Sequence, residues 1–328
     1  MIVIGIETSC DDTSFAVVED GYKIRANIIS SQTIHSKYGG VVPELASREH
    51  IKNISYVFEK GMKAAKITLK DVDGIAVTNR PGLIVSLLVG LNFAKGLAYA
   101  GRIPLIGVNH TLGHIYSNHL SKSEPEFPYI GFILSGGHTI LCKVHNYTTI
   151  EVIGTTRDDA IGEAFDKISK FMGFGYPGGP IIDKLSKSGN PNSIKFPRPR
   201  FKDKSLDFSY SGLKTAVLNY YRKNPDTSKA DIAASFQKTA IDILIINLKR
   251  YLEKENVSRL SITGGVSANS YLRKTMTEFS KNNNIKLFIP SHELCTDNAA
   301  MIAGLGTRLL EEGKKDTLKL DAYSRGIK

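Results

Sequence analysis

The fold class of this chain is decided by the stretch Phe132-Ile133-Leu134-Ser135-Gly136-Gly137-His138-Thr139-Ile140-Leu141. Two apolar runs flank a Gly-Gly pair, which predicts a strand, a tight turn and a second strand. Adjacent glycines allow positive φ angles and leave their backbone N–H groups free of side chains. Such N–H groups can bind a phosphate, or an oxygen that gains negative charge during a reaction. A plain hairpin without a ligand is the alternative interpretation.

The layout around this hairpin occurs twice in the chain. A strand, a turn and a strand are predicted at residues 2–19 and again at residues 130–144. Later in each half an apolar strand ends in a glycine-bearing exit, at Val72–Gly82 and at Arg259–Asn269. Two similar α/β halves whose ligand-binding turns face each other predict a ligand in a cleft between them.

A polar, proline-bearing segment, Ser121–Pro128, separates the two halves and is the predicted domain linker. The first domain is therefore expected at residues 1–124 and the second at residues 125–328. Whether the last helix packs back on the first domain is left open. A chain of 328 residues is long enough for two such domains.

The composition indicates an ordinary globular protein with a basic surface. Hydrophobic residues make up 41% of the chain and charged residues 23%. The 43 basic and 32 acidic residues give a net charge of +11, which favours an acidic partner such as nucleic acid. A basic surface without a partner is the alternative.

The cysteines and the apolar segments indicate a cytoplasmic protein. The three cysteines lie far apart and form no CxxC pair, so we expect neither a disulfide framework nor a zinc ribbon. The first residues contain no basic segment before their apolar run, so we expect no signal peptide. The run Gly82–Gly101 has apolar residues at i, i+3 and i+4, which predicts a buried helix and no membrane span.

Two histidines share one helix face after the predicted strand Ile103–Val108. His110 and His114 are four residues apart, so both imidazoles can bind one metal ion. Thr111 stands where a zincin protease has the glutamate that acts as its base, which argues against a protease. Two packed histidines without a metal are the alternative. A third ligand would favour the metal, and Asp297 at the start of the final predicted helix is the candidate.

Charged clusters provide further candidates. Carboxylates and hydroxyls in the turn Glu7–Thr13 are typical of phosphate and metal sites, but also of ordinary turns. Asp159, Glu163 and Asp166 recur at helical spacing, either as a solvated face or to bind a ribose hydroxyl or a metal. The window Lys195–Lys204 carries five cations and two phenylalanines, which could grip a phosphate backbone and stack on a base. A solvated surface loop is the alternative for this window.

Nine short motifs, in order along the chain, together resemble one known family. They are Gly5–Asp11, Gly39–Arg48, His110–His114, Leu134–Thr139, Gly162–Lys167, Tyr176–Pro180, Phe208–Thr215, Gly264–Asn269 and Cys295–Asn298. The family is that of the bacterial TsaD-type tRNA N6-adenosine threonylcarbamoyltransferases, a glycoprotease-related family. The resemblance implies an α/β fold of the actin, sugar-kinase and Hsp70 type, with two duplicated ribonuclease-H-like halves around a central cleft.

The resemblance also implies a metal centre. His110, His114 and Asp297 would bind one divalent metal ion, usually iron in this family, with zinc as the alternative. In the related archaeal and eukaryotic subfamily a tyrosine at the start of the Ser-Gly-Gly strand adds to the metal site. Ile133 stands at that position here, so the resemblance implies three protein ligands.

Nine residues of the second half are implied to bind an adenine nucleotide, either the adenylate substrate or ATP or ADP. Those along the substrate phosphate and carbonyl are Ile133, Leu134, Ser135, Gly136 and Gly137. Those that hold the adenosine are Asp166, Gly179, Asp183 and Asn269.

The implied reaction moves a threonylcarbamoyl group from threonylcarbamoyl-AMP to the exocyclic amine of the adenine next to the tRNA anticodon. N–H groups of Gly136 and Gly137 would stabilise developing negative charge. An adenine amine is a weak nucleophile, so positioning must supply much of the rate. Asp11, on the turn after the first strand, is our candidate general base.

The implied partners are tRNA, a TsaB-type paralogous subunit, a TsaE-type small ATPase and a TsaC-type synthase that supplies the adenylate. A cytoplasmic location without a membrane is expected. Two other hypotheses are a metalloendopeptidase and a non-catalytic ATP-binding scaffold. Thr111 argues against the first, and an intact set of metal ligands argues against the second.

Overall fold

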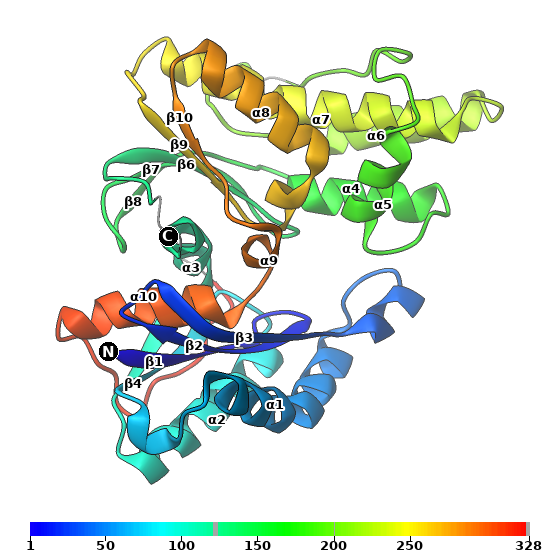
Figure 1. Cartoon of the computed structure of the whole chain (residues 1–328). Helices are drawn as coiled ribbons and strands as arrows, with labels where there is room; N and C mark the ends of the chain where they lie inside the picture. The colour runs from blue at the N-terminus through cyan, green and yellow to red at the C-terminus, as the bar shows by residue number, and fades with distance from the viewer. Residues whose placement is uncertain (121–123, 200, 326–328) are drawn as a thin grey trace. The chain divides into compact units, whose positions relative to one another are not determined.

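Two compact units make up the computed structural model of this protein, which describes residues 1–120, 124–199 and 201–325 (Figure 1). Unit 1 consists of Met1–Glu124 and Pro290–Lys328, and unit 2 of Pro125–Ile289. Each unit contains one mixed five-stranded sheet. The chain passes from unit 1 to unit 2 within the predicted linker Ser121–Pro128, of which residues 121–123 lie outside the described residues.

The sheet of unit 1 has the strand order β3-β2-β1-β4-β5. Its strands are β1 (Ile2–Glu7), β2 (Asp12–Glu19), β3 (Lys23–Ser31), β4 (Gly74–Arg80) and β5 (Leu105–Asn109). β1 pairs antiparallel with β2 and parallel with β4, and β4 pairs parallel with β5. Because both faces of β1 are covered, its sequence is an almost unbroken run of apolar residues.

Helices cover both faces of this sheet (Figure 1). Unit 1 contains α1 (Pro43–Ala65), α2 (Ile84–Gly101), α3 (His110–Tyr116), α9 (His292–Cys295) and α10 (Ala299–Glu311), of which α1, α2 and α10 form the main contacts with the sheet. A Cβ atom on Gly5 of β1 would lie 2.2 Å from the Ala299 carbonyl oxygen, so a glycine there lets α10 lie directly on the sheet. Helices α1 and α2 pack against each other and against the sheet.

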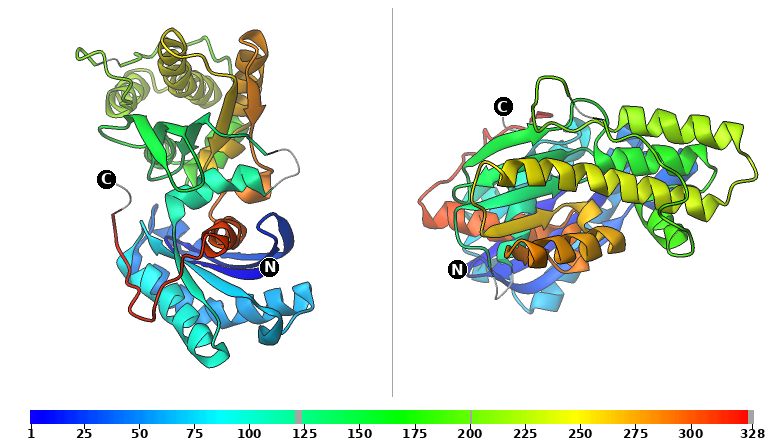
Figure 2. Two further views of the ribbon diagram at one scale, coloured as in Figure 1. Left: turned by 90° about the vertical axis from the view of Figure 1, so that its left-hand side faces the viewer. Right: turned by 90° about the horizontal axis from the view of Figure 1, so that it is seen from above.

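The end of the chain belongs to unit 1, which corrects the predicted second domain of residues 125–328. Helix α10 packs on β1, β2 and β4 because small residues face it there. The segment after α10 then returns along unit 1 (red in Figure 2). There Asp316 forms a β-bridge with Leu105, and the Tyr323 backbone N–H donates to the Asn79 carbonyl. Burial of α10 on the first sheet therefore decides the boundary.

Helix α2 corresponds to the predicted buried helix. Among the described residues it is the one helix whose length and composition would allow it to cross a membrane. It packs against α1 and β4, as core helices of globular units also do, so its composition is weak evidence for a span.

The sheet of unit 2 has the strand order β10-β9-β6-β7-β8. Its strands are β6 (Tyr129–Leu134), β7 (Thr139–Val144), β8 (Ile150–Thr155), β9 (Arg259–Thr263) and β10 (Lys286–Phe288). The predicted hairpin is present, with Ile133 opposite Ile140 and Leu134 opposite Thr139. β6 also pairs parallel with β9, so their carboxyl ends lie at the same edge of the sheet.

Five long helices complete unit 2. They are α4 (Ile161–Phe171), α5 (Gly178–Ser186), α6 (Ser211–Lys223), α7 (Lys229–Leu252) and α8 (Ser270–Asn282). The apolar side chains of α4, α7 and α8 form one buried core with β6 and β9. Asp159 precedes α4, so it does not share a helical stripe with Glu163 and Asp166, and that interpretation of the three carboxylates is wrong.

Gly264, at the exit of β9, is expected to be intolerant of any side chain. Its φ is +87°, and a Cβ atom would lie 2.4 Å from the Leu134 carbonyl oxygen. Gly264→Ala should therefore lower the free energy of unfolding by about 2–4 kcal/mol. Gly265→Ala is the matched control, because a Cβ there meets no atom within 4 Å. Urea denaturation of both variants checks this, and equal midpoints would contradict the argument.

Candidate metal centre and nucleotide-binding residues

The two histidines of the predicted metal site come from α3, which begins directly after β5. The Asn109 side chain accepts a hydrogen bond from the Leu112 N–H and caps the start of this helix. His110 and His114, one turn apart, place their ring centres 4.6 Å from each other. Both side chains are buried, so the strand end and the cap together hold them in defined positions.

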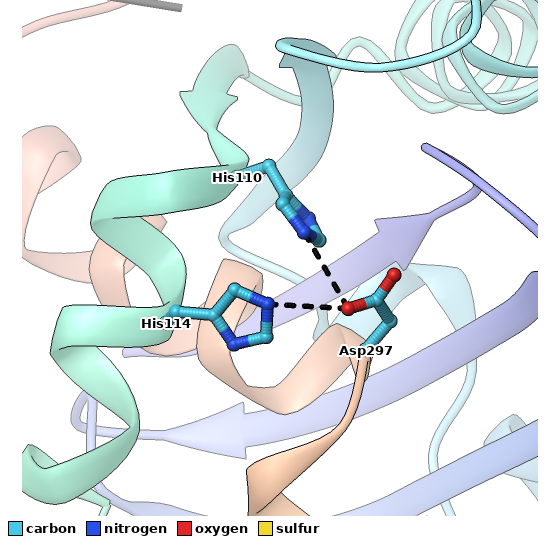
Figure 3. A group of neighbouring side chains, drawn as sticks. All are labelled: His110, His114 and Asp297. Carbon is cyan, nitrogen blue, oxygen red and sulfur yellow. Dashed lines mark hydrogen bonds and ion pairs between the residues drawn. The ribbon is translucent and has the colours of Figure 1, made fainter. Parts of the chain in front are cut away.

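Asp297 reaches the two histidines from the loop before α10 (Figure 3). Its Oδ1 lies 3.1 Å from His114 Nε2 and 3.4 Å from His110 Nε2. The three potential ligand atoms all lie within 4.8 Å of one another. Asn298 caps α10 by accepting the Met301 N–H, which fixes the residue beside Asp297. The structure thus brings Asp297 to two histidines that lie 187 and 183 positions earlier in the sequence.

The chemistry of this cluster fits a divalent metal ion. Two imidazoles and one carboxylate are a donor set that zinc and non-haem iron both accept, with positions left open for substrate. Burial opposes ionisation of Asp297, yet the neighbouring His110 and His114 hold its pKa well below the usual range. His114 Nε2 is the nitrogen that faces Asp297, and His114 Nδ1 is buried with no hydrogen-bond partner among the described residues.

Glu7, the last residue of β1, holds His110 from the other side. Its carboxylate is fully buried, and Oε2 lies 2.9 Å from His110 Nδ1. Thr78 Oγ1 donates to the same oxygen at 2.6 Å, and the Ser9 N–H donates to Oε1 at 2.5 Å. Burial opposes ionisation, yet the charge and hydrogen bond of His110 help to hold the pKa of Glu7 below its usual value.

The contact between Glu7 and His110 has a chemical consequence. A carboxylate that accepts the Nδ1–H of a histidine leaves Nε2 as the metal-binding nitrogen. Burial lowers the pKa of His110, but Asp297 and Glu7 together raise it well above its usual value. From the sequence, Glu7 is one residue of a polar turn, with no role of its own. The feature of the sequence that could have singled out Glu7 is its position, because this carboxylate directly follows the apolar run of residues 2–6.

The turn after β1 carries two further carboxylates. Asp11, the candidate general base, is half-buried, and burial raises its pKa. Asp12 was not selected from the sequence, but burial, with the negative charge of Asp297 as the next cause, raises its pKa to about 7. Asp12 is therefore a carboxylate that is able to exchange a proton near neutral pH.

A chain of hydrogen bonds through two histidines ties this turn to the loop before α1. His50 Nε2 lies 3.0 Å from the Cys10 carbonyl, which can only accept, so His50 carries its proton on Nε2. The Gln32 side chain donates toward His50 Nδ1 and accepts from His35 Nε2 at 2.8 Å. His35 Nδ1 in turn accepts the Val42 N–H. Protonation of the His50 ring would place a second donor against the Gln32 amide.

This arrangement predicts a loss of stability in mild acid. Burial lowers the pKa of His50, so the unfolded chain binds its proton at a higher pH than the folded chain. The stability that the neutral ring contributes is present above the unfolded pKa of about 6.5 and is lost as the pH falls below it. Urea unfolding at pH 7.5 and pH 5.5 should show a smaller difference for His50→Gln than for the wild type. His145→Gln, at an exposed histidine, serves as the control, and an unchanged difference in His50→Gln would contradict the assignment.

In unit 2 the turn between β6 and β7 lies against the start of α4. Ser135 closes the turn, because its N–H donates to the His138 carbonyl and its Oγ accepts the His138 N–H. Gly162 in the first turn of α4 donates its N–H to the Ser135 carbonyl, and a Cβ there would lie 2.6 Å from that oxygen. The exposed Gly136 and Gly137 thus lie beside a helix N-terminus, which favours anions. Neither glycine has a positive φ, so the turn does not use the conformational freedom that glycine allows.

Two of the predicted adenosine-binding residues lie around the start of α5. Asp166, on α4, accepts a hydrogen bond of 2.7 Å from the Gly178 N–H. The contact fixes the position of the first turn of α5, in which Gly179 leaves open space where a side chain would be. Such an open backbone position allows a ligand to approach closely.

The other two residues, Asp183 and Asn269, meet at the start of α8. Asp183 accepts hydrogen bonds from the Ser270 N–H and hydroxyl, at 3.2 and 2.9 Å. Asn269 caps α8 through its oxygen, and its amide donates to the buried Gln237 at 2.7 Å. Gln237 was not selected from the sequence, because an isolated glutamine inside a helical pattern gives no signal. Gln237 orients Asn269 by accepting from its amide nitrogen, while the amide oxygen of Asn269 caps the helix.

The candidate residues thus fall into two groups. The metal set and Asp11 lie in unit 1, and the nine nucleotide residues lie in unit 2. In the basic window, Phe196 is only 4% exposed, so it packs in the core and cannot stack on a base, which corrects that expectation for one of the two phenylalanines. Arg200 of the same window lies outside the described residues.

Comparison with known proteins decides which family carries this combination of residues. A family model described as TsaD, tRNA N6-adenosine threonylcarbamoyltransferase, matches residues 23–304. The chain belongs to this family. Two curated relatives carry the same description. That from Thermosipho africanus is 50% identical over 325 residues, covering 98% of each chain. That from Clostridium perfringens is 49% identical over 326 residues, covering 98% of this chain and 96% of the relative.

Solved structures support the fold class. Full-length HypF in its phosphate- and nucleotide-bound form has a TM-score of 0.64 at 14% identity, over 96% of this chain and 47% of that chain. Component A of (R)-2-hydroxyglutaryl-CoA dehydratase from Acidaminococcus fermentans has a TM-score of 0.59 at 14% identity, over 96% and 100% of the two chains. These likenesses concern the fold alone. They confirm the predicted α/β class of the actin, sugar-kinase and Hsp70 type.

Membership of the TsaD family makes the protein a transferase that modifies tRNA. Its function is the transfer of a threonylcarbamoyl group to an adenosine of tRNA. The alternatives of an endopeptidase and of a non-catalytic scaffold are thereby set aside.

Proposed function

We propose that His110, His114 and Asp297 hold one divalent metal ion during this transfer, with Fe²⁺ as the first candidate and Zn²⁺ as the second. The observation that supports the proposal is the convergence of three ligand atoms within 4.8 Å, backed by the buried Glu7. A divalent ion bound by such a set supplies Lewis-acid chemistry toward a carbonyl oxygen. Glu7 keeps the Nε2 atom of His110 directed toward Asp297.

The donor in this proposal is threonylcarbamoyl-AMP. A bond forms between the adenine N6 and the carbamoyl carbon, the bond from that carbon to the phosphate oxygen breaks, and AMP leaves with the electron pair. The N–H groups of Gly136 and Gly137, with the start of α4 beside them, stabilise the negative charge on phosphate and carbonyl oxygens. Their exposure leaves these groups available to a ligand.

The adenosine part of the donor binds at Asp166, Gly179, Asp183 and Asn269. Carboxylates suit the ribose hydroxyls as acceptors, and the open backbone at Gly179 admits a ligand. Both Asp183 and Asn269 already fix the start of α8, so they are held rigidly before any nucleotide binds. Rigid groups lower the entropic cost of binding.

The attacking amine must lose one proton. Asp11, the candidate from the sequence, and its neighbour Asp12 are the carboxylates of the turn that could accept it. A base with a pKa near the operating pH transfers protons most efficiently. Burial raises the pKa of both carboxylates, that of Asp12 to about 7, so both are candidates for this role.

The proposal includes helper proteins. A TsaC-type synthase supplies the adenylate, and a TsaB-type subunit and a TsaE-type ATPase assist turnover in the cytoplasm. The exposed apolar side chains of α1 and α2 support a paralogous partner on that face. They are Ile51, Tyr56, Ile84, Val85 and Tyr99.

A transfer assay tests the proposal. Metal-loaded protein would be mixed with synthetic threonylcarbamoyl-AMP and unmodified tRNA, with and without the TsaB-type and TsaE-type proteins. Mass spectrometry of digested tRNA then detects the modified adenosine. Product that depends on the added metal is expected. Equal product from metal-stripped protein would overturn the metal assignment, and no product with all helpers present would overturn the choice of donor.

A further inference from the structure

The positive charge of the protein is concentrated in unit 2. Within Pro125–Ile289 there are 24 basic and 15 acidic residues, whereas the rest of the chain has 19 and 17. Unit 2 therefore carries +9 of the net charge of +11. An excess confined to one unit indicates a defined surface for an acidic partner, since a general solubility effect would not require such a separation.

Part of this charge lies on a segment that runs along α7. The segment begins with Asn190, whose N–H donates to Asp231 Oδ1 at 2.7 Å, in the first turn of α7. Further along, the Ile194 N–H donates to Ser235 Oγ at 3.2 Å. Arg198 NH2 then donates to Asp242 at 2.6 Å. Each contact is followed by one farther along the helix, so segment and helix run in the same direction.

The last part of the segment is held by two side chains near the end of α7. The Arg250 guanidinium donates to the Lys204 and Ser205 carbonyls, at 2.7 and 2.9 Å. The Asn247 amide donates to the Leu206 and Asp207 carbonyls, at 3.0 and 2.9 Å. From the first contact to the last the segment follows α7 for about 29 Å, at 1.5 Å per helical residue. The described parts of the segment on both sides of residue 200 are therefore anchored on α7, as an unsupported surface loop is not.

Acidic groups beside the segment are already paired with other cations. Arg157 pairs with Asp203 and Asp207, each at 2.6 Å, and Lys238 shares Asp242 with Arg198. Three exposed lysines remain, and none of them forms an ion pair with another described residue. They are Lys195, Lys202 and Lys204, and we call them the basic strip.

We infer that the basic strip binds the phosphate backbone of tRNA. The inference rests on the proposed function, because it assigns a contact surface to the substrate of that reaction. Three unpaired ammonium groups along about 22 Å of α7, from the contact at Ser235 to that at Arg250, suit a run of phosphates. Because the supporting backbone is already held by α7, little ordering entropy opposes binding. The contacts are with phosphates, so they add affinity without base specificity.

The test compares two triple variants of the full-length protein. The strip variant is Lys195→Ala with Lys202→Ala and Lys204→Ala. The control variant removes the same charge from exposed lysines elsewhere in unit 2, as Lys254→Ala with Lys281→Ala and Lys286→Ala. Dissociation constants for unmodified tRNA are measured by fluorescence anisotropy over a range of salt concentrations.

The strip variant should bind tRNA about 10–100-fold more weakly, and its log–log salt slope should fall by about one for each lysine removed. The control variant should stay within about threefold of the wild type. Wild-type affinity and slope in the strip variant would overturn the inference, as would equal losses in both variants. Loss of polyglutamate binding with tRNA binding intact would assign the strip to an acidic protein and also overturn it.

Failure of the proposed metal site is distinguishable in the same experiment. His110→Ala should bind tRNA like the wild type and yield no product, because the strip lies on other residues. The strip variant should yield product at saturating tRNA. His110→Ala thus measures tRNA binding without catalysis, and the strip variant measures catalysis without the basic strip.

Discussion

Asp297→Ala is expected to release the metal ion and to lower the rate of transfer by at least about 100-fold. The carboxylate is the only negatively charged member of the three-residue set, and it contacts both Nε2 atoms. Without it, two neutral imidazoles remain, and they do not hold a divalent ion in a fixed position. Metal content by atomic emission after dialysis, measured beside single-turnover transfer, checks both parts.

Asp226→Ala is the control for the Asp297 experiment, because Asp226 is exposed and lies in the loop between α6 and α7. It should keep full metal content and rate. Retention of the metal by Asp297→Ala would exclude Asp297 as a ligand. Loss of the metal with an unchanged rate would show that the transfer does not depend on this ion.

Glu7→Gln is expected to weaken metal binding about 10–100-fold while the ligands themselves stay in place. Each of the three groups that face Glu7 donates a hydrogen bond, namely His110 Nδ1–H, the Thr78 hydroxyl and the Ser9 N–H. A glutamine replaces one acceptor with a donor, so at least one of these groups faces another donor. The orientation of His110 is then no longer enforced.

Competition with a chelator of known affinity gives the metal dissociation constant of this variant, and urea denaturation gives its stability. Glu19→Gln is the control, because Glu19 ends the neighbouring strand and pairs with exposed cations. An unchanged metal affinity in a destabilised Glu7→Gln would assign Glu7 to packing alone. At a high metal concentration the weakened site of Glu7→Gln should again be fully occupied, and transfer should be restored. Loss of a catalytic group would not be reversed in this way.

Much of the fold was predictable from local patterns. The Gly-Gly hairpin, the strand at Ile2–Glu7 and the helix at Ile84–Gly101 carry periodicities that few alternative structures satisfy. Within the glycine-bearing exit after β9, residues 265–268 form a 3₁₀ turn, and the α-helical turns of α8 begin only at Ser270. Local sequence does not distinguish these two kinds of turn well.

The residue types of the metal site were also readable in the sequence, since a spacing of i and i+4 places two histidines on one face of any helix. The third ligand could not be derived from local sequence, because no local pattern connects Asp297 to His110 and His114. The two meet because small residues on β1 let α10 pack flat on the first sheet, which brings the preceding loop to α3. The same packing makes the end of the chain, Pro290–Lys328, part of unit 1.

Glu7, Asp12 and Gln237 show what depends on long-range packing. As sequence they are a strand end, a turn residue and a helical glutamine. Their roles come from burial beside groups that are distant in the sequence. Glu7 contacts His110, 103 residues away, and Gln237 contacts Asn269, 32 residues away. A side chain's pKa and its hydrogen-bond partners depend on the neighbours that surround it in space. Periodicity and motif spacing are properties of neighbours along the chain, and so they predicted the elements and the ligand types but not these contacts.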